Sequence, residues 1–568
     1  MNDLTLALQH FQRGIIHFAN GDYRSAEICL LEASRLAPNR PSVLANLSAV
    51  YTKTGRHSEA VGFANAAVKA DPKNARCWHQ LGAAQLGLKQ IKEALSSLDA
   101  AIRLDETVVE AHVNKGYCLN ELGRHTEAIT CLERAIRIDP KNSDAHTNMG
   151  VALNATKRYS EAIGHFDESI KNNPANAFAH NNRGLALAEL KRFEEALMSY
   201  EKAIHLEPSI ADFHCNRADA LKEVARFDEA LVSYDRAISL TPSHAKALYN
   251  KGFLLLSLGK LREGFKLYAA RRELGDATAS TLTTSLPRWD GSTRTGRILI
   301  WAEQGIGDEV FYSSMLPLIT GRTVDLTVSA DKRLHAVYLR SFPGIKLIDR
   351  NTQEQLDLRN YDAQTSLVNL PAALRMELHE LTAQRRVPFF KPDITQKEAI
   401  AANGGFLRGA PVCGISWRSA NKAFGTKKSV KLADLAPLIS SPDITFVNLQ
   451  YGEVAGEIEE VRQKLGASIH LVDGLDPFND IDGLLALIDN CDIVFTTSNV
   501  TAHLAGSIGK KAVVLVPSGE ARIWYWFGES QSRWYPSIKL VHQGSSLDWR
   551  KPIEVATALI KEGLCLNA

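Results

Sequence analysis

A carboxylate among glycines is the first group in this chain that could take part in chemistry. The segment EQGIGDEV (303–310) follows the apolar run RILIWA and places Asp308 just after Gly305 and Gly307, which allow a tight turn and the close approach of a ligand. The spacing is not a dinucleotide-binding fingerprint, because Val310 stands at the third glycine position. The acid Asp308 would also repel a pyrophosphate at this loop. Asp308 instead suits a general base that takes a proton from an attacking hydroxyl, or else it only caps the helix that comes next.

A basic segment after a second apolar run could hold a phosphate. Within GISWRSANKAFGTKKSVKLADL (414–435) it carries four cations, which are Arg418, Lys422, Lys427 and Lys428. Positive charge just past a strand end could neutralise a leaving diphosphate. We therefore assign Trp417, Arg418 and Lys428 to donor binding; the alternative is an ordinary solvated loop.

A third segment combines a strand, a helix and a strand in DIVFTTSNVTAHLAGSIGKKAVVLVP (492–517). Ser498 and Asn499 fall at the helix N-terminus, where free backbone N–H groups and the helix dipole favour phosphate. Thr501 and His503 lie within its first turn or so. The histidine could bond the diphosphate or the donor sugar, or could pack under the sheet. No carboxylate pair of the DxD kind occurs in a donor loop, so no metal is expected.

Alternating strands and helices must position these three loops. After a polar stretch typical of a linker (279–296), short β-branched runs alternate with helical patterns, including one helix expected from about 308 to 319. The alternation pauses near VPFFKPD and restarts, which predicts two parallel α/β lobes at 297–390 and 391–568. Two Rossmann-like lobes leave a cleft between the carboxyl ends of their sheets, where ligands bind.

The first half of the chain repeats itself every 34 residues. Small residues recur at two positions of this period, which lets two antiparallel helices approach closely: Gly14, Ser48, Gly82, Gly116, Gly150, Gly184, Ala218 and Gly252, and twelve positions later Ala26, Ala60, Ala94, Ala128, Ala162, Ala196, Ala230 and Gly264. Larger residues four positions further on, such as Phe166 and Tyr200, are expected to fill the space between neighbouring helix pairs, and a proline then breaks the helix. This is the tetratricopeptide-repeat (TPR) pattern. It predicts an α-solenoid of about eight repeats over residues 7–278, whose degenerate eighth copy caps the array against the second half of the chain.

One position on the first helix of each repeat is always a primary amide. It reads Gln12, Asn46, Gln80, Asn114, Asn148, Asn182, Asn216 and Asn250. An amide offers donors and an acceptor to the backbone of an extended peptide, and the series resembles the asparagine ladder in the TPR arm of eukaryotic O-linked N-acetylglucosamine transferases. The six asparagines are the predicted peptide-binding residues; the alternative is a polar inner face copied from one ancestral repeat. Histidines two positions earlier, such as His112 and His146, are interpreted as structural and not as metal ligands.

Composition excludes several classes of protein. With 66 Lys+Arg against 64 Asp+Glu in 568 residues, the chain has no broad basic surface for nucleic acid. Its eight cysteines are scattered without metal-ligand spacing, as in a reduced cytoplasmic protein. No signal peptide and no apolar run long enough to span a bilayer is recognised. We therefore expect a cytoplasmic protein without a membrane span.

The loops together resemble the GT-B glycosyltransferases of family 9, which include the heptosyltransferases of lipopolysaccharide synthesis. The resemblance covers about Pro287 to the C-terminus and rests on PRWDGS leading to EQGIGD and on SNVTAHLAGSIGKK, both familiar from bacterial TPR proteins with this module. It implies that Asp308 is the base and that Arg418 and Lys428 contact phosphate. Heptosyltransferases carry an aspartate where this chain has Ser498, so the heptose donor is not implied.

Five aromatic residues near the C-terminus also recur in that TPR-linked group. They are Trp524, Tyr525, Trp526, Trp534 and Tyr535. They could stack on a base or sugar, or pack the final strands.

These assignments predict an inverting transfer of a sugar from a nucleotide-diphosphate donor to a Ser or Thr hydroxyl of a protein held by the TPR arm. The nucleotide sugar is a co-substrate, and no cofactor is expected. Bacterial flagellin glycosyltransferases that join TPRs to a GT-B domain are the functional analogy, with flagellin as one candidate acceptor. Two alternatives stay open: a TPR scaffold whose second domain is inactive or only binds nucleotide, and an enzyme whose acceptor is a glycan. The donor, the acceptor and the oligomeric state are left undetermined by the sequence.

Overall fold

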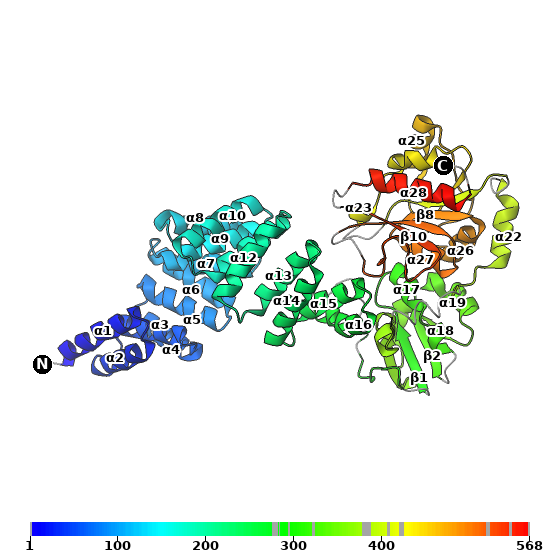
Figure 1. Ribbon diagram of the computed structural model, residues 1–568. Coiled ribbons are helices and arrows are strands. Elements are labelled where there is room, and N and C mark those ends of the chain that lie inside the picture. The colour runs from blue at the N-terminus through cyan, green and yellow to red at the C-terminus, as the bar shows by residue number, and fades with distance from the viewer. Residues whose placement is uncertain are drawn as a thin grey trace. The chain divides into compact units, whose positions relative to one another are not determined.

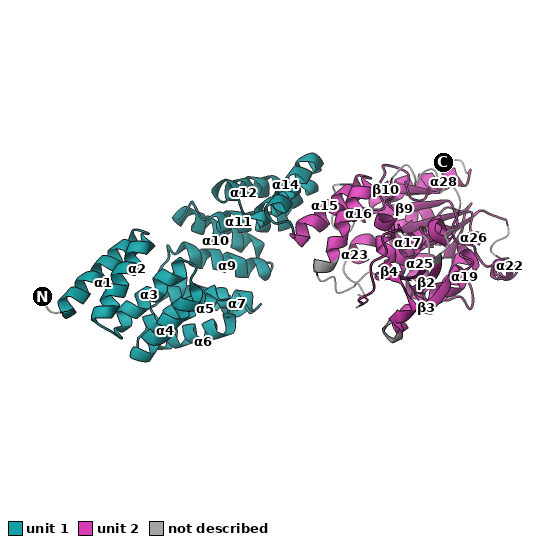
Figure 2. Cartoon of the chain, turned by 90° about the horizontal axis from the view of Figure 1, so that it is seen from below, with its two compact units in different colours: residues 1–242 teal, residues 243–568 magenta. Residues whose placement is uncertain are grey.

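The computed structural model describes residues 3–274, 282, 284–292, 296–320, 324–377, 388–405, 409–419, 425–518, 523–544 and 548–565. Their contacts divide the chain into two compact units, residues 1–242 and 243–568, coloured teal and magenta in Figure 2. Where it is described, the first unit is helical throughout, whereas the second joins one helix pair to an α/β fold (Figure 1).

Helix pairs with a constant period make up the N-terminal part of the described chain. The first helix of each pair is α1 (Asp3–Ala19), α3 (Pro41–Lys53), α5 (Ala75–Gly87), α7 (Val109–Glu121), α9 (Ser143–Ala155), α11 (Ala177–Glu189), α13 (Ala211–Glu223) or α15 (Ala245–Ser257). The second helix is α2 (Tyr23–Leu36), α4 (His57–Ala70), α6 (Ile91–Leu104), α8 (His125–Ile138), α10 (Tyr159–Asn172), α12 (Phe193–Leu206), α14 (Phe227–Leu240) or α16 (Leu261–Tyr268). From α3 onward each first helix begins 34 residues after the previous one. The sequence period is therefore the period of an α-solenoid.

Glycine lets the two helices of one pair touch. A Cβ built on Gly150 would lie 2.5 Å from the ring of Phe166, and one built on Gly184 would lie 2.6 Å from the ring of Tyr200. Both rings are fully buried. The large residue therefore packs within its own pair, against the glycine of the first helix. This corrects the expectation that it fills the space between neighbouring pairs.

Four histidines tie a first helix to the turn that precedes it. One ring nitrogen of each lies within hydrogen-bonding distance of the carbonyl oxygen six residues earlier: His112 with Glu106 (2.9 Å), His146 with Pro140 (3.1 Å), His180 with Pro174 (3.2 Å) and His214 with Pro208 (3.0 Å). Burial lowers the pKa of three of these rings, so they are neutral near pH 7. The contact gives these histidines a structural role.

Two parallel sheets form the core of the second unit. The first has the order β3-β2-β1-β4, with β1 (Gly296–Trp301), β2 (Val324–Ala330), β3 (Lys346–Asp349) and β4 (Ala363–Ser366). The second has the order β10-β9-β8-β5-β6-β7, with β5 (Val412–Ser416), β6 (Thr445–Asn448), β7 (Ile469–His470), β8 (Ile493–Thr497), β9 (Ala512–Val516) and β10 (Ile538–His542). Renumbered from β5, this is the 3-2-1-4-5-6 strand order of doubly wound nucleotide-binding folds. Ligands bind in such sheets where the strand order reverses, here between β5 and β8.

Helices connect and cover these strands. Those of the first lobe are α17 (Ile306–Ser313), α18 (Pro317–Thr320), α19 (His335–Ser341) and α20 (Leu370–Ala373). Those of the second lobe are α22 (Ile394–Asn403), α23 (Gly425–Lys428), α24 (Ala436–Ile439), α25 (Ala455–Leu465), α26 (Ile481–Asn490), α27 (Val500–Ser507) and α28 (Arg550–Gly563). The single helix expected over 308–319 is divided into α17 and α18. The hydroxyls of Ser313 and Ser314 bond the carbonyls three residues earlier, which competes with helix hydrogen bonds, and Pro317 begins a new helix.

The predicted linker is part of the first lobe where it is described. Trp289 is buried, and its backbone N–H donates to the carbonyl of Gln364 at 2.8 Å, while the N–H of Gln364 donates to Pro287 at 3.0 Å. Gly291 has φ +81°, and a Cβ there would meet the carbonyl oxygen of Ala373 at 2.1 Å. Only glycine fits that position. The sequence PRWDG therefore forms an edge of the sheet beside β4 and is not a free connection.

The eighth helix pair is built into the α/β unit, as the magenta colour of α15 and α16 in Figure 2 shows. Phe265 of α16 meets Trp524 edge to face, with ring centroids 5.2 Å apart. Arg271, just after α16, forms an ion pair with Glu303 in which the two side chains are 4% and 0% exposed. Glu303 lies between β1 and the loop that carries Asp308. The last repeat thus braces the loop in which the sequence places the catalytic base.

Candidate functional site

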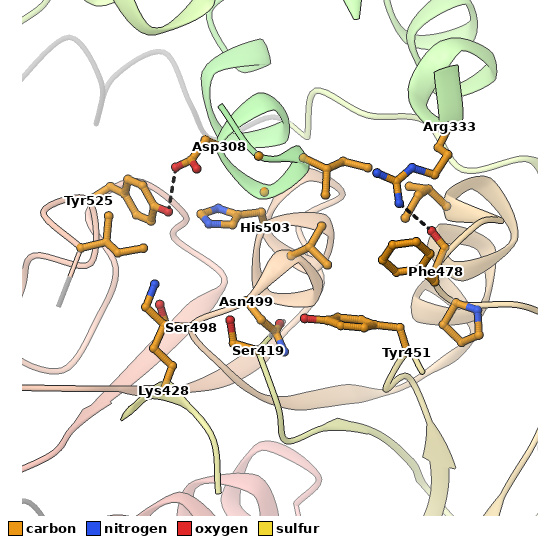
Figure 3. Close-up of a pocket in the computed structure, with 17 residues that line it drawn as sticks. Asp308, Arg333, Ser419, Lys428, Tyr451, Phe478, Ser498, Asn499, His503 and Tyr525 are labelled. Carbon is orange, nitrogen blue, oxygen red and sulfur yellow. Dashed lines mark hydrogen bonds between the residues drawn. The ribbon is translucent and has the colours of Figure 1, made fainter. Parts of the chain in front are cut away.

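A cavity of about 270 Å³ opens at the carboxyl ends of both sheets (Figure 3). Its lining comes from segments that follow β1, β2, β5, β6, β7 and β8, together with residues before β10. All three loops singled out in the sequence contribute to it. The helices α17 and α27, one from each lobe, pack against each other beside it.

Asp308 lines this cavity and is held by Tyr525. The tyrosine hydroxyl donates to Oδ1 of Asp308 at 3.2 Å (Figure 3). Burial raises the pKa of Tyr525 well above its usual range, so its hydroxyl stays a donor. The N-cap of α17 is Gly305, which makes Asp308 the third residue of the helix and rules out the alternative that it is the cap. A carboxylate that a tyrosine hydroxyl helps to orient toward a cavity has the geometry of a general base.

Gly305 and Gly307 line the cavity but do not form the tight turn expected from the sequence. Neither belongs to the described glycines with positive φ. A Cβ on Gly307 would lie 3.5 Å from the ring of His503 and 3.7 Å from Cα of Val500. Gly307 therefore lies where α17 approaches α27, and a Cβ there would make only ordinary van der Waals contacts.

Lys428 is the cation that the basic segment brings to the cavity. It is 4% exposed and lines the cavity. Burial lowers the pKa of Lys428, and the nearby charge of Asp308 opposes that shift. Within the described part of the chain its ammonium has no hydrogen bond or ion pair. It is thus available to an anionic ligand, whereas Lys422 lies outside the described residues.

Arg418 and Trp417 do not reach the cavity, which corrects their assignment to donor binding. The guanidinium of Arg418 pairs with Glu457 at 2.8 Å and donates to the carbonyl of Glu453 at 2.8 Å. Trp417 is fully buried, and its Nε1–H donates to Glu457 at 2.9 Å. Glu457 of α25 therefore holds both side chains. Of the three residues assigned from this segment, only Lys428 lines the cavity.

The turn before α27 carries both a free acceptor and a structural cap. Ser498 is 4% exposed and lines the cavity, and its Oγ has no hydrogen-bond partner among the described residues. Asn499 caps α27 by accepting from the N–H of Thr501 at 3.0 Å, and it donates to Ser416 at 2.9 Å and to the carbonyl of Arg418 at 3.1 Å. Its amide is therefore occupied by the protein. Thr501 is fully buried and does not line the cavity, so Ser498 alone offers a free side chain here.

His503 is a neutral ring enclosed by aromatic residues. It is 2% exposed, stacks on Trp526 at 5.0 Å between centroids, and has Nδ1 3.1 Å from the hydroxyl of Tyr535. Burial lowers the pKa of His503 to about 3, with a further contribution from the charge of Lys428. Since Tyr535 occupies Nδ1, Nε2 is the ring nitrogen left to bond a ligand in the cavity.

Arg333, Tyr451 and Phe478 line the opposite end of the cavity and were missed in the sequence (Figure 3). Arg333 pairs with Asp331 at 2.8 Å, donates to the carbonyl of Phe478 at 3.0 Å, and lies 4.9 Å above the Phe478 ring. The rings of Tyr451 and Phe478 are 6.1 Å apart and form an apolar wall. Each residue follows the carboxyl end of a strand, and this position in the sequence could have marked it as a candidate for ligand binding.

The C-terminal aromatics mainly join the two lobes. All five are at most 3% exposed. The ring of Phe311 in α17 lies 4.2 Å from that of Trp534 and 4.4 Å from that of Tyr525. Tyr525 also lines the cavity, whereas the other four do not. The packing alternative therefore holds for those four.

The asparagine ladder lies on the first helices of the repeats, with uneven access. Asn46, Asn114, Asn148, Asn182 and Asn250 are half-buried, whereas Asn216 is 8% exposed and donates to Asn181 at 3.0 Å. Asn46 donates to the carbonyl one turn earlier, and Asn114 lies 3.2 Å from His79 of the preceding repeat. The ladder is therefore linked into the array, and peptide binding by it stays a prediction.

Comparison with known families confirms the TPR repeats. Models described as tetratricopeptide repeat match residues 11–75, 75–108, 177–210 and 215–277, and a TPR repeat model matches 116–157. Among curated proteins, protein FlbA of Caulobacter vibrioides is 29% identical over 327 residues, which cover 55% of this chain and 54% of FlbA. Stress-induced-phosphoprotein 1 of Caenorhabditis elegans is 32% identical over 119 residues, covering 20% of this chain and 37% of that protein. The chain thus spans about half or less of these relatives.

Two of the solved structures that match this chain are described as TPR proteins. YrrB, a TPR protein with an unusual peptide-binding site, is 22% identical and covers 33% of this chain and 97% of its own, with a TM-score of 0.28. A thermophilic TPR protein of Thermus thermophilus is 21% identical and covers 32% of this chain and 99% of its own, with a TM-score of 0.29. Within the described residues, none of the helices combines the length and apolarity needed to cross a bilayer. Nor does that part of the chain hold a cluster of three or more potential metal ligands.

Proposed function

We propose that this protein is a glycosyltransferase that moves a sugar from a nucleotide-diphosphate donor to a Ser or Thr hydroxyl of a polypeptide recruited by its TPR repeats. One arrangement carries the proposal: Asp308 of the first lobe faces Lys428, Ser498 and His503 of the second across one cavity. Two parallel sheets that meet at their carboxyl ends also support a GT-B domain of the family 9 type. Flagellin stays one candidate acceptor, by analogy of architecture alone.

In this mechanism each side chain has a separate task. Asp308 takes the proton of the acceptor hydroxyl as the hydroxyl oxygen attacks the anomeric carbon, with inversion. The bond between that carbon and the phosphate oxygen breaks, and the diphosphate leaves toward Lys428, the Ser498 hydroxyl and the N–H groups at the start of α27. His503, neutral at pH 7, contributes a hydrogen bond and not a charge. Arg418 takes no part, because Glu457 already holds it.

An isosteric change at the base tests the proposal. Asp308→Asn keeps an acceptor for Tyr525 but loses the base, so kcat should fall by about 10²–10⁴-fold while donor binding persists. The measurement is nucleotide release from UDP-, GDP-, CMP- and ADP-linked sugars, with thermal shift for binding. Arg418→Gln is the control, with less than about a twofold change expected because that side chain does not line the cavity. Equal release by the parent and Asp308→Asn across the whole panel would exclude Asp308 as the base.

The TPR repeats support a second candidate function, a protein-interaction scaffold. For a scaffold, the parent and Asp308→Asn should show the same near-zero consumption of every nucleotide sugar of the panel, whether or not the second domain binds one. A glycan acceptor is tested by alanine at Asn114, Asn148 and Asn182 together, which should leave transfer to a glycan unchanged and greatly reduce transfer to a polypeptide. We place the protein in the cytoplasm, a proposal supported by its eight free cysteines.

A further inference from the structure

The face of the repeats that carries the asparagine ladder is acidic in four consecutive repeats. It consists of the second, sixth, ninth and thirteenth residues of α7, α9, α11 and α13, whose spacing of three and four puts them on one side of each helix. We call it the ladder stripe; its members are Glu110, Asn114, Tyr117, Glu121, Asp144, Asn148, Val151, Ala155, Phe178, Asn182, Leu185, Glu189, Asp212, Asn216, Asp219 and Glu223. Seven of these sixteen residues are acidic and none is basic.

One glutamate on the second helix of each of four repeats is neutralised by an arginine, in contrast to three acids of the ladder stripe. Glu127, Glu161, Glu195 and Glu229 each pair with the arginine three residues earlier at 2.7 Å. Glu110, Glu121 and Asp144 of the ladder stripe are exposed and have no ion pair with any described residue. These three stripe carboxylates can therefore pair with an outside cation, whereas the four second-helix glutamates already have an arginine partner.

Three stripe acids stand where they oppose helix stability. Glu121, Glu189 and Glu223 are the last residues of α7, α11 and α13. Negative charge at a helix C-terminus is disfavoured by the partial negative charge of the last carbonyl groups. The α3 helix ends instead on Lys53, the residue type that helix stability favours. Glu223 lies 3.6 Å from Lys222, whereas Glu121 has no ion pair with any described residue, so helix stability does not explain Glu121 and recognition of a cation does.

Two exposed rings complete the chemistry of the ladder stripe. Tyr117 is 41% exposed and Phe178 is 54% exposed. Aromatic faces contact the aliphatic stems and charged heads of Lys and Arg. The ladder amides, the carboxylates of Glu110, Glu121 and Asp144, and the two exposed rings therefore share one surface. The equivalent positions of α3 and α5 hold Lys53 and Arg76 and no acid, so the acidic character begins at α7.

We infer that the ladder stripe docks an extended polypeptide segment rich in Lys or Arg. The asparagines bind its backbone, and the exposed carboxylates of Glu110, Glu121 and Asp144 pair with its cations. The inference rests on the proposed recruitment of a polypeptide by the repeats and adds the chemistry of that polypeptide. Binding is independent of the cavity, so it survives even if no sugar is transferred.

Peptides that differ only in charge test this docking surface. Three labelled synthetic peptides of equal length alternate serine with lysine, glutamate or glutamine, and fluorescence anisotropy measures their binding to the full chain without donor. The lysine peptide should bind best, and more weakly as salt is raised. The triple variant Glu110→Gln, Glu121→Gln, Asp144→Asn should weaken binding by at least about tenfold.

A matched variant distinguishes an effect of the ladder stripe from an effect of the overall charge of the protein. Glu127→Gln, Glu161→Gln and Glu195→Gln together remove the same charge from the second helices and should change binding by less than about twofold. Equal weakening by both triple variants, preference for the glutamate peptide, or no binding of the lysine peptide would each overturn the inference. Five of the six positions are exposed, Glu195 is half-buried, and the amides are isosteric, so circular dichroism should show unchanged helix content. Loss of transfer with retained peptide binding would instead count against the proposed enzyme alone.

Discussion

The contacts that shape the repeat array are local in sequence, whereas those that shape the cavity of the α/β unit join distant residues. In the array, the contact that shapes each helix pair joins residues of one repeat, as with Gly150 and Phe166. In the α/β unit, the contact that orients Asp308 comes from Tyr525, 217 residues further along the chain. A local pattern therefore defines a repeat, whereas the cavity depends on where whole lobes are placed.

The eighth helix pair shows what happens where these two kinds of contact meet. The α15 and α16 helices keep the spacing of the repeats but bury Phe265 against Trp524 of the second lobe. Repeat periodicity by itself would assign the pair to the array. Packing makes it part of the α/β unit.

The largest loss of stability is expected where the eighth helix pair joins the α/β unit. Arg271→Leu removes the cation paired with the buried Glu303, and breaking a buried pair on one side costs about 3–5 kcal/mol. Seven of the eight tryptophans lie within 243–568, so denaturant unfolding followed by tryptophan fluorescence reports on this unit. Arg271→Met with Glu303→Leu should recover most of the loss, because no unpaired charge remains. A double variant as unstable as the single one would show that the ion pair is not the cause.

Two glycines of one unit should respond differently to the same methyl group. A Cβ on Gly252 would lie 2.7 Å from the backbone nitrogen of Tyr268, so Gly252→Ala should force α15 and α16 apart and destabilise by about 1–3 kcal/mol. Gly307→Ala meets only ordinary contacts and should change stability by less than about 1 kcal/mol. The midpoint of urea unfolding measures both. Similar losses in the two variants would mean that the repeat glycine is no more constrained than the site glycine.

The smallest expected effect is a pH dependence from His503. Its pKa is about 3 when folded and near 6.5 when unfolded, so between these values the unfolded state binds more protons and stability falls as pH falls. The loss is about 0.7 kcal/mol between about pH 7 and about pH 6. Glu309 changes stability in the opposite direction, because burial raises its pKa to about 7. Its contribution to the free energy of unfolding therefore falls as pH rises from 4.5. The difference in slope between the parent and His503→Gln isolates the histidine; identical slopes would remove it as a cause.

Most regular elements could be predicted because their signals are local. The glycine and proline spacing marks the helix pairs, and β-branched runs mark β1, β2, β5, β8 and β9. The β4 strand, AQTS, has no such run. It is a strand because β1 pairs with it and because Gln364 accepts from the indole of Trp301 at 2.8 Å, contacts that exist only after the sheet has formed.

The sequence by itself determined the repeat period, the amide ladder and the loops that carry Asp308, Lys428, Ser498 and His503. It did not distinguish Lys428 from Arg418, because both stand in one basic segment. The tertiary structure decided between them, since Glu457 of a distant helix neutralises the arginine and leaves the lysine buried beside the cavity. Arg333, Tyr451 and Phe478 were likewise decided by folding. Spacing along a chain records helix and strand geometry, whereas the partner of a charge is set by whichever segment folds against it.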